Sequence, residues 1–298
     1  MMPKPPRISV IVPVFEAEAS IGHCLRSIAG QSLEDMEILV VHKPGRDRTW
    51  QEIRAVGDSR IRILEQREDT GPGGARNIGI AAARGEYLGF VEADDSIDRD
   101  FYATLYAHCQ IERADMACAS LSLHGKPPAL PSKGGPKTLL SFADKLDFFQ
   151  NGASFDKLFR AKLVKSHNIA FAEGLRWEDN PFLVQAAFHS TKIVACPETC
   201  YHYRPSPWSA DYRQKLEGDV APILAEIARF MEQNALAPAE RAALLRFLLR
   251  SFAGGFLHND GVYRALTEHF GFSFPLFLRR QKRRFKLWRR SFGGLSHG

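Results

Sequence analysis

The sequence has few cysteines and no long apolar run, and both absences narrow its class. Its five cysteines, an odd number scattered along the chain, do not fit a disulfide framework and favour a reducing compartment. No uncharged apolar stretch approaches the ~20 residues of a membrane-spanning helix. Residues 1–7 are polar and proline-rich and lead straight into an apolar strand pattern, so we expect no signal peptide.

Glycine and acidic residues are missing from two informative places. The first strand-to-helix turn, residues 13–19, has no glycine, which argues against a nicotinamide dinucleotide site but not against a nucleotide held through a metal. Between Gly271 and Gly298 there is no acid, but there are eight Lys and Arg. Subtracting these eight charges from the net +6 leaves −2 for the remainder. Because the basic character is confined to one end and no base-reading module is present, we expect no nucleic-acid partner.

Strand and helix patterns alternate along the first part of the chain. Strand patterns lie at 8–14, 37–41, 60–64, 86–91 and near 115–121, with helical patterns at 21–29, 47–56, 75–83 and 98–112. This alternation predicts an α/β fold with a mostly parallel sheet sandwiched by helices. Residues 140–205 have mixed patterns and 210–266 are helical in pattern, so we divide the chain into domains 1–208 and 209–298.

Two groups of acids are candidates for chemistry. Glu92, Asp94 and Asp95 follow the fourth strand pattern, and ligands bind at such strand ends in open α/β sheets. Their oxygens suit Mg²⁺ or Mn²⁺, although a solvated turn that caps the next helix explains them equally well. Asp179 begins another helical pattern beside Trp177, where it fits either a general base or a helix cap.

Seven short motifs, taken in order, are the most specific signal in the chain. They are Ser9-Val-Ile-Val-Pro-Val-Phe15, Cys24-Leu-Arg-Ser-Ile-Ala-Gly-Gln-Ser32, Gly73-Gly-Ala-Arg-Asn-Ile-Gly79, Arg84-Gly-Glu-Tyr-Leu-Gly-Phe-Val-Glu-Ala-Asp-Asp95, Asp156-Lys-Leu-Phe159, Trp177-Glu-Asp-Asn-Pro-Phe182 and Tyr201-His-Tyr-Arg204. In this order they make the chain up to residue 205 resemble the family 2 glycosyltransferases of GT-A fold, especially bacterial enzymes that build surface polysaccharides.

The resemblance implies a nucleotide-sugar donor, a UDP-sugar in the first place, and a glycan or lipid-linked acceptor. It places Asp94 as a ligand of Mn²⁺ or Mg²⁺, and Glu92 at the nucleotide ribose or at a metal-bound water. Asp179 falls on the general base of a transfer that inverts the anomeric centre. His202 is a candidate for a later metal ligand, although a lone histidine between two tyrosines on a strand is more often structural.

Further residues of the resemblance surround the expected nucleotide. Pro13 and Phe15 belong to the first motif. Arg76 and Asn77 begin a helix, where an arginine and free N–H groups suit phosphate. An alternative of nearly equal weight is that Arg76 only pairs with the acidic rim, that is, with the acids that follow the fourth strand pattern. Asp47 is the last acid of an element that the family usually writes Asp-Asp-Gly-Ser-x-Asp.

That element differs here in a way that affects the expected function. The chain has His42-Lys43-Pro44-Gly45-Arg46-Asp47 where the family has two leading aspartates, the first of which hydrogen-bonds the base. Glu16 likewise replaces an asparagine or similar residue. An imidazole and an ammonium in place of two carboxylates reverse the local charge. The nucleotide is therefore read differently, bound weakly or no longer used. The alternative function is a catalytically silent protein that binds a glycan or a partner glycosyltransferase.

The basic end of the chain also carries apolar residues. Phe277, Leu278, Phe285 and Trp288 gather on one side at helical spacing, with cations dominating the rest. This composition is typical of a helix lying in an anionic membrane interface, or of a solvated basic end that docks on the slightly acidic body. With a lipid-linked acceptor, we expect a cytoplasmic enzyme that is peripheral on the inner face of the cell membrane. The sequence leaves a homo-oligomer open.

Removal of the residues after Gly271 tests the membrane interpretation. We expect the truncated protein to lose binding to anionic liposomes, because each nearby Lys or Arg contributes about 1 kcal/mol of attraction to anionic headgroups. Transfer to a soluble acceptor analogue should persist. Co-sedimentation at low salt measures the binding, and equal sedimentation of the truncated and intact chains would exclude the tail as an anchor.

Overall fold

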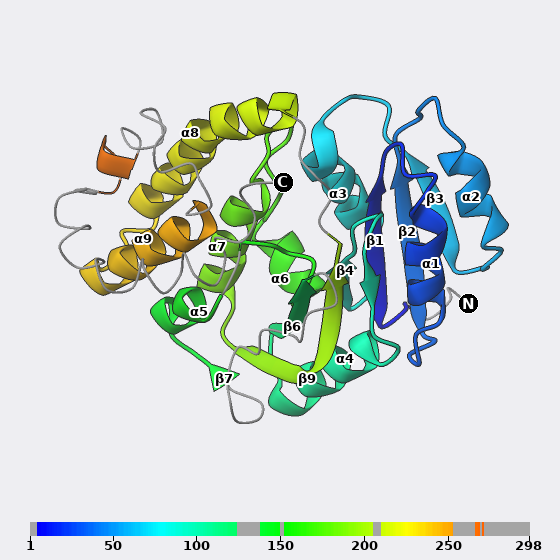
Figure 1. Ribbon diagram of the computed structural model, residues 1–298. Helices are drawn as coiled ribbons and strands as arrows, with labels where there is room; N and C mark the ends of the chain where they lie inside the picture. Colours follow the sequence, from blue (N-terminus) through cyan, green and yellow to red (C-terminus); the bar gives the residue numbers. More distant parts are fainter. Residues whose placement is uncertain are drawn as a thin grey trace.

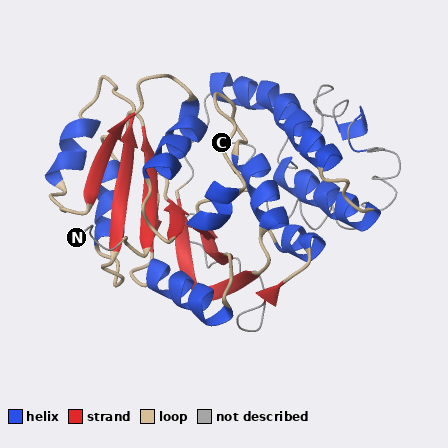
Figure 2. Ribbon diagram, turned by 180° about the vertical axis from the view of Figure 1, so that it is seen from behind, coloured by secondary structure: helices blue, strands red, loops and turns tan. Residues whose placement is uncertain are grey.

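The computed structural model describes residues 5–123, 138–149, 152–204, 210–252, 266–268 and 270. The loop 124–137, the predicted boundary at 208 and the basic tail lie outside these residues. Figure 1 shows a central sheet with helices on both faces, and Figure 2 shows the same layers from behind. Among the described helices, none combines the length and the apolar character needed to cross a membrane.

The first four strands are parallel, as the sequence predicts. They are β1 (Ile8–Val14), β2 (Met36–His42), β3 (Ile61–Glu65) and β4 (Tyr87–Phe90), in the spatial order β3-β2-β1-β4. Helices α1 (Ile21–Ala29), α2 (Thr49–Ala55) and α3 (Gly71–Ala82) connect them. β1 and β2 are buried along their whole length, which explains their continuous apolar sequence. All four strands end at one edge, where ligands bind in sheets of this kind.

Beyond β4 the sheet becomes mixed. β8 (Lys157–Arg160) runs antiparallel to both β4 and β6 (Met116–Leu123), whereas β9 (Ile193–Tyr203) is parallel to β6. Two short strands, β5 (Ser96–Ile97) and β7 (Thr138–Leu139), pair antiparallel with β9. The pairing of β9 with β5 brings the end of β9 beside the turn that follows β4, although the two segments are distant in the sequence.

The remaining helices cover the far part of the sheet. They are α4 (Phe101–Glu112), α5 (Phe142–Phe148), α6 (Ala161–Ser166), α7 (Asp179–His189), α8 (Ala210–Gln233) and α9 (Pro238–Phe252). α8 packs on α7, and α9 packs on α5 and α7. Leu224 of α8 and Phe247 of α9 are buried in the same hydrophobic core as Leu88 of β4. The described C-terminal helices therefore share a core with the sheet.

Helix α3 begins at Gly71 rather than at the predicted Ala75. The glycines of its first turn have no side chains, so this turn can form against the backbone of a neighbouring segment. Gly71 has a φ of +67°, and a Cβ at Gly73 would lie 2.4 Å from the carbonyl oxygen of Ala172. The start of α3 therefore packs directly against the segment that leads to α7. This contact brings Arg76, in the second turn of α3, close to the start of α7.

His189, the last residue of α7, is favoured in its neutral form, and this makes the stability of the fold depend on pH. Burial lowers the pKa of His189, and the neighbouring His167, whose ring stacks on it at 4.0 Å between centroids, lowers it further. The native state therefore resists a proton that the unfolded chain takes up. The contribution of His189 to stability is full above the unfolded pKa of about 6.5, and it is lost as pH falls from that value through the lower pKa of the folded state.

We expect His189→Phe to weaken this pH dependence, because phenylalanine keeps an aromatic ring against Phe188 and Phe230 but binds no proton. Urea denaturation midpoints between about pH 7.5 and 5 measure the effect. The exposed His23 offers a control in His23→Gln. If the midpoints of wild type and His189→Phe fall in parallel on acidification, His189 does not cause the loss.

Candidate active site

A turn after β4 carries three acids at the edge of the sheet, and β9 holds that turn in place. The Tyr201 hydroxyl accepts a hydrogen bond from the Glu92 N–H at 3.0 Å and donates one to Asp95 Oδ2 at 2.7 Å. Asp95 Oδ1 accepts from the Arg204 N–H at 2.7 Å. Asp95 is buried, and burial raises its pKa to about 7. Asp95 thus anchors the turn, whereas Asp94 beside it stays partly exposed.

Arg76 is buried between two acidic groups. Its Nη2 donates to Glu92 Oε1 at 2.5 Å and its Nη1 donates to Glu178 Oε1 at 2.6 Å. Its guanidinium also lies 5.1 Å from the centroid of the Phe171 ring. Arg76 is only 3% exposed, so salt screens these ion pairs little. In this structure, therefore, Arg76 pairs with the acidic rim and joins α3, the turn after β4 and the start of α7.

Asp179 is the first residue of α7 and stands beside Glu178. No side-chain hydrogen bond caps the start of α7, and Asp179 Oδ1 is buried without a hydrogen-bond partner among the described residues. Burial raises the pKa of Glu92, and the nearby charge of Asp179 raises it further, so Asp179 belongs to the same cluster. A carboxylate oxygen that accepts no hydrogen bond is suited to take a proton. No capping hydrogen bond accounts for Asp179 at the start of α7, and its role as a general base stays a prediction.

His202 lies beside the turn but is held by a different acid. It pairs with Ser96 of β5, and its Nε2 shares a hydrogen bond of 2.7 Å with Asp98 Oδ1. Within the described ranges, Glu92, Asp94 and His202 do not gather as a three-ligand cluster. A hard cation bound here would therefore rely on the oxygen of Asp94 and on substrate phosphate oxygens. Mg²⁺ sites with one or two carboxylates work in this way, so the residues present fit such an ion.

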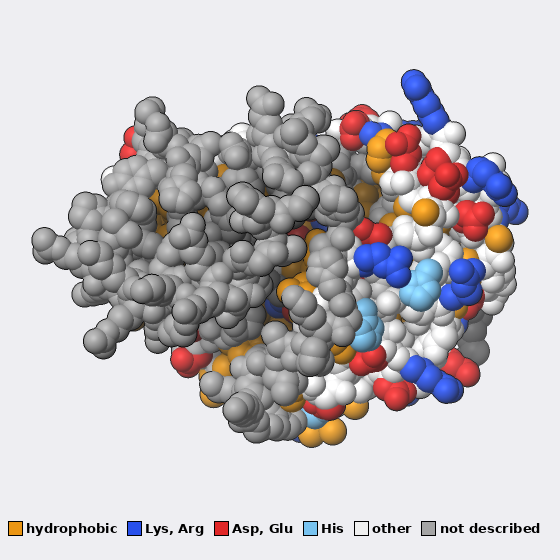
Figure 3. Space-filling model, viewed as in Figure 1, with side chains coloured by type: hydrophobic (Ala, Val, Ile, Leu, Met, Phe, Trp, Pro, Cys, Tyr) orange, Lys and Arg blue, Asp and Glu red, His pale blue; other side chains and the backbone are white. Residues whose placement is uncertain are grey.

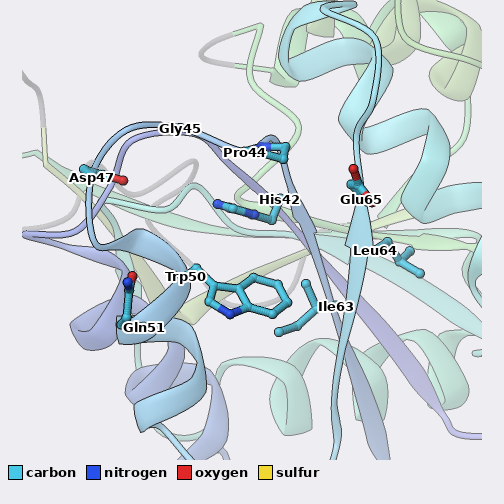
Figure 4. Close-up of a pocket in the computed structure, with 9 residues that line it drawn as sticks. All are labelled: His42, Pro44, Gly45, Asp47, Trp50, Gln51, Ile63, Leu64 and Glu65. Atoms are coloured by element: carbon cyan, nitrogen blue, oxygen red, sulfur yellow. The ribbon is translucent and has the colours of Figure 1, made fainter.

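A recess of about 570 Å³ opens at the ends of β2 and β3. It is lined by residues of β2, the following loop, α2 and β3, drawn in Figure 4: His42, Pro44, Gly45, Asp47, Trp50, Gln51, Ile63, Leu64 and Glu65. The rings of His42 and Trp50 lie 5.8 Å apart between centroids, and Trp50 is 42% exposed. Burial lowers the pKa of His42, which favours the neutral imidazole. Without a Lys or Arg among these lining residues, the recess suits a flat, uncharged group better than a phosphate.

The residues that follow β1 lie at the same edge of the sheet. Pro13 is buried within β1, while Phe15 and Glu16 are exposed beyond it. Lys43 Nζ lies 4.4 Å from the centroid of the Phe15 ring and forms an ion pair of 2.7 Å with Asp69. The Lys43 charge is thus neutralised by an acid from the loop before α3. Figure 3 shows acidic and basic side chains intermixed over the described part of the viewed face, so that part is not a basic surface.

Asp47 and Asn77, two predicted nucleotide contacts, hold loops in this structure. Asp47 Oδ1 accepts from the Thr49 N–H and its Oδ2 accepts from the Glu18 N–H, both at 3.1 Å. Asn77 donates through Nδ2 to the Phe171 carbonyl oxygen at 3.0 Å and accepts through Oδ1 from the Phe171 N–H at 2.9 Å. These contacts fix the loop after β2 and the segment before α7. Asp47 also lines the recess.

Several residues of the site carry no role in the sequence interpretation. Glu178 stands inside a quoted motif, but its partnership with Arg76 depends on the packing of α3 on the segment before α7. Tyr201 also lies in a quoted motif, and a buried tyrosine needs a partner for its hydroxyl; the sequence does not name Asp95 as that partner. Trp50 has no sequence signal, because its exposure depends on the recess that the fold creates.

Comparison with known proteins identifies the family. Residues 9–168 match the model described as glycosyl transferase family 2. The chain belongs to this family. The matched segment includes the acids after β4 and Arg76, but ends before α7 and Asp179.

Individual relatives agree with the family assignment. The uncharacterized glycosyltransferase EpsJ of Bacillus subtilis (strain 168) is 31% identical over 216 residues, which are 68% of this chain and 62% of EpsJ. This chain thus spans somewhat less than two thirds of EpsJ. The crystal structure of S. aureus TarS 1–349 in complex with UDP-GlcNAc has a TM-score of 0.73 at 22% identity, covering 88% of this chain and 80% of that one.

A second solved structure has a similar fold. The mannosyltransferase PcManGT from Pyrobaculum calidifontis, in complex with GDP-Man and Mn²⁺, has a TM-score of 0.62 at 15% identity and covers 96% of this chain and 83% of its own. At these identities the likeness concerns the fold. The predicted GT-A fold, with a central sheet flanked by helices, is confirmed.

Proposed function

We propose that this member of glycosyl transferase family 2 is a metal-dependent, inverting glycosyltransferase. It would move a sugar from a nucleotide-sugar to a hydroxyl group of a polysaccharide or lipid-linked acceptor. The observation that supports this function best is the cluster around Arg76. It brings Glu92, which lies two residues before Asp94 in the turn after β4, next to Asp179, a carboxylate with an unpartnered oxygen. A transfer enzyme needs this combination of a phosphate-binding edge and a base.

The donor-side acids, Glu92 and Asp94, would hold the diphosphate through a metal ion. Asp94 is partly exposed at the ends of the parallel strands and would bind Mn²⁺ or Mg²⁺ together with phosphate oxygens, with His202 as a further candidate ligand. When bound, such an ion stabilises the negative charge that develops on the departing diphosphate. Glu92, which is fixed by Arg76, would contact the ribose or a water on the metal.

Asp179 would act on the acceptor. Its free carboxylate oxygen takes the proton of the acceptor hydroxyl as the hydroxyl oxygen attacks the anomeric carbon. The bond from that carbon to the diphosphate oxygen breaks at the same time, and its electron pair leaves with the diphosphate. Attack from the face opposite the leaving group inverts the anomeric centre.

The base of the donor would occupy the recess beside Trp50. Parallel strands lie about 4.8 Å apart, so two strand spacings separate β2, which ends at His42, from β4, which leads to Asp94. The recess and Asp94 therefore lie along the same edge of the sheet, with β1 between them. TarS was solved with UDP-GlcNAc and the mannosyltransferase with GDP-Man, which supports a nucleotide-sugar. A UDP-sugar remains our first expectation, read by an imidazole instead of a carboxylate.

The names of the relatives and the composition of the tail support a proposal for the class of acceptor. TarS of Staphylococcus aureus (strain Mu50) is named a poly(ribitol-phosphate) beta-N-acetylglucosaminyltransferase and is 26% identical over 205 residues. We therefore propose a cell-surface polymer or its lipid-linked precursor as acceptor. The basic, apolar tail would keep the enzyme on the inner membrane surface, where a lipid-linked acceptor diffuses.

Asp94→Asn and Asp179→Asn separate donor binding from chemistry. With Mn²⁺ present, we expect UDP-GlcNAc or GDP-mannose to raise the melting temperature of wild type and Asp179→Asn, but not of Asp94→Asn. Nucleotide release by slow donor hydrolysis, in which water replaces the acceptor, should fall at least about 100-fold in both variants. If no nucleotide-sugar stabilises wild type with Mn²⁺, the silent-protein alternative is favoured. If Asp179→Asn releases nucleotide at the wild-type rate, Asp179 is not the base.

Substitutions in the recess test where the base lies. Trp50→Ala should weaken UDP and GDP binding alike, because stacking does not depend on the identity of the base. His42→Asp should strengthen UDP binding about 10-fold, since a carboxylate accepts the N–H of uracil and such charged hydrogen bonds contribute about 1.5–3 kcal/mol. Calorimetric titration with Mn²⁺ present measures both, with His189→Phe as a control far from the recess. Unchanged affinity in Trp50→Ala would place the base elsewhere.

A further inference from the structure

We propose that Glu178 is a positioning residue: it takes the positive charge of Arg76 and thereby leaves the neighbouring Asp179 free to act as the base. This inference rests on the proposed function, because it assumes that Asp179 accepts the proton of the acceptor. It assigns different tasks to two adjacent acids at the start of α7.

The first support is the way the Arg76 guanidinium is used. Its two Nη atoms donate to Glu178 and Glu92, at 2.6 and 2.5 Å, whereas Asp179 Oδ1 has no hydrogen-bond partner among the described residues. Burial lowers the pKa of Arg76, but the charges of Glu92, Asp179 and Glu178 raise it and prevail. Asp179 is thus close enough to attract the cation without being bonded to it at that oxygen.

The second support is the difference in burial and length between the two acids. The Glu178 side chain is 7% exposed and Arg76 is 4% exposed at the side chain, whereas Asp179 is intermediate in exposure. The longer Glu178 reaches inward to the buried cation, and the shorter Asp179 stays nearer the surface of the site. Removing one partner of a buried ion pair leaves an uncompensated charge that seeks another.

Without the Glu178 charge, Asp179 is the next acid beside Arg76. Among the described residues, the charged groups that interact with Asp179 include Arg76 from α3, Glu92 after β4 and Glu178 itself. Arg176, from the preceding loop, is paired with Asp219 of α8 at 2.9 Å. If Glu178 lost its charge, the attraction of Arg76 for Asp179 would therefore become stronger, because one competing carboxylate would be gone. A nearby cation favours the ionised carboxylate, so Asp179 would be a weaker base in such a variant.

Glu178→Gln tests this role because glutamine keeps the shape and one oxygen that can accept from Arg76. With Mn²⁺ and UDP-GlcNAc or GDP-mannose, whichever stabilises wild type, we expect donor affinity to stay within about 2-fold while nucleotide release falls about 10-fold. The acidic limb of the release rate against pH should move to lower pH. Asp219→Asn, which removes an ion pair of the same segment, is the matched control and should change neither quantity.

A double variant distinguishes positioning from a merely structural role. Adding Arg76→Gln to Glu178→Gln removes the competing cation, so the acidic limb should return towards its wild-type position. An unchanged rate and limb in Glu178→Gln, or a limb that stays shifted in the double variant, would overturn the proposal. Failure of wild type to bind any nucleotide-sugar with Mn²⁺ would instead overturn the proposed function, and with it this inference.

Discussion

A buried arginine that bonds to two acids is the interaction on which the site depends. Arg76 reaches Glu92, 16 residues away in the sequence, and Glu178, 102 residues away. Breaking a buried pair by removing one partner costs about 3–5 kcal/mol, because the other charge is left uncompensated. The turn after β4 and the start of α7 are thus fixed relative to one another by the same guanidinium.

In each of two pairs of adjacent acids, one acid is buried and bonded, whereas the other is less buried. After β4, Asp95 is buried and bonds to Tyr201 and the backbone of Arg204, whereas Asp94 is partly exposed beside it. At the start of α7, Glu178 is buried on Arg76, whereas Asp179 keeps an unpartnered oxygen. In both places the more buried acid determines where the backbone runs, and the less buried acid, Asp94 or Asp179, remains available for a ligand. An acid with both tasks would do neither well, since a bonded carboxylate is a weaker base and a poorer ligand.

Local patterns predict the parallel strands and most of the helices because burial on both faces gives β1 and β2 continuous apolar sequences. The antiparallel insertion of β8 between β4 and β6 is not predictable from them, since strand order depends on contacts distant in the sequence. Family motifs place Glu92, Asp94, Arg76 and Asp179 as candidates, and the structure brings Arg76, Glu92 and Asp179 into one cluster. The Arg76–Glu178 bond was beyond sequence reasoning, because it requires the close approach of α3 that Gly73 permits.

The free-energy cost of burying these charges bears on the choice between an enzyme and a catalytically silent binding protein. Burying one cation among three carboxylates adds little net stability, and well-packed apolar residues often serve as well or better. A protein that only displayed a surface to a glycan or a partner would gain nothing from such an arrangement at its core. An enzyme gains a rigid base and a rigid donor edge, and preorganised charges are the largest contribution that a site can make to transfer chemistry. The replacement at His42 alters the recess that we propose for the base, two strands away, and leaves this cluster intact. The departure in the sequence therefore bears on which nucleotide is bound more than on whether transfer occurs.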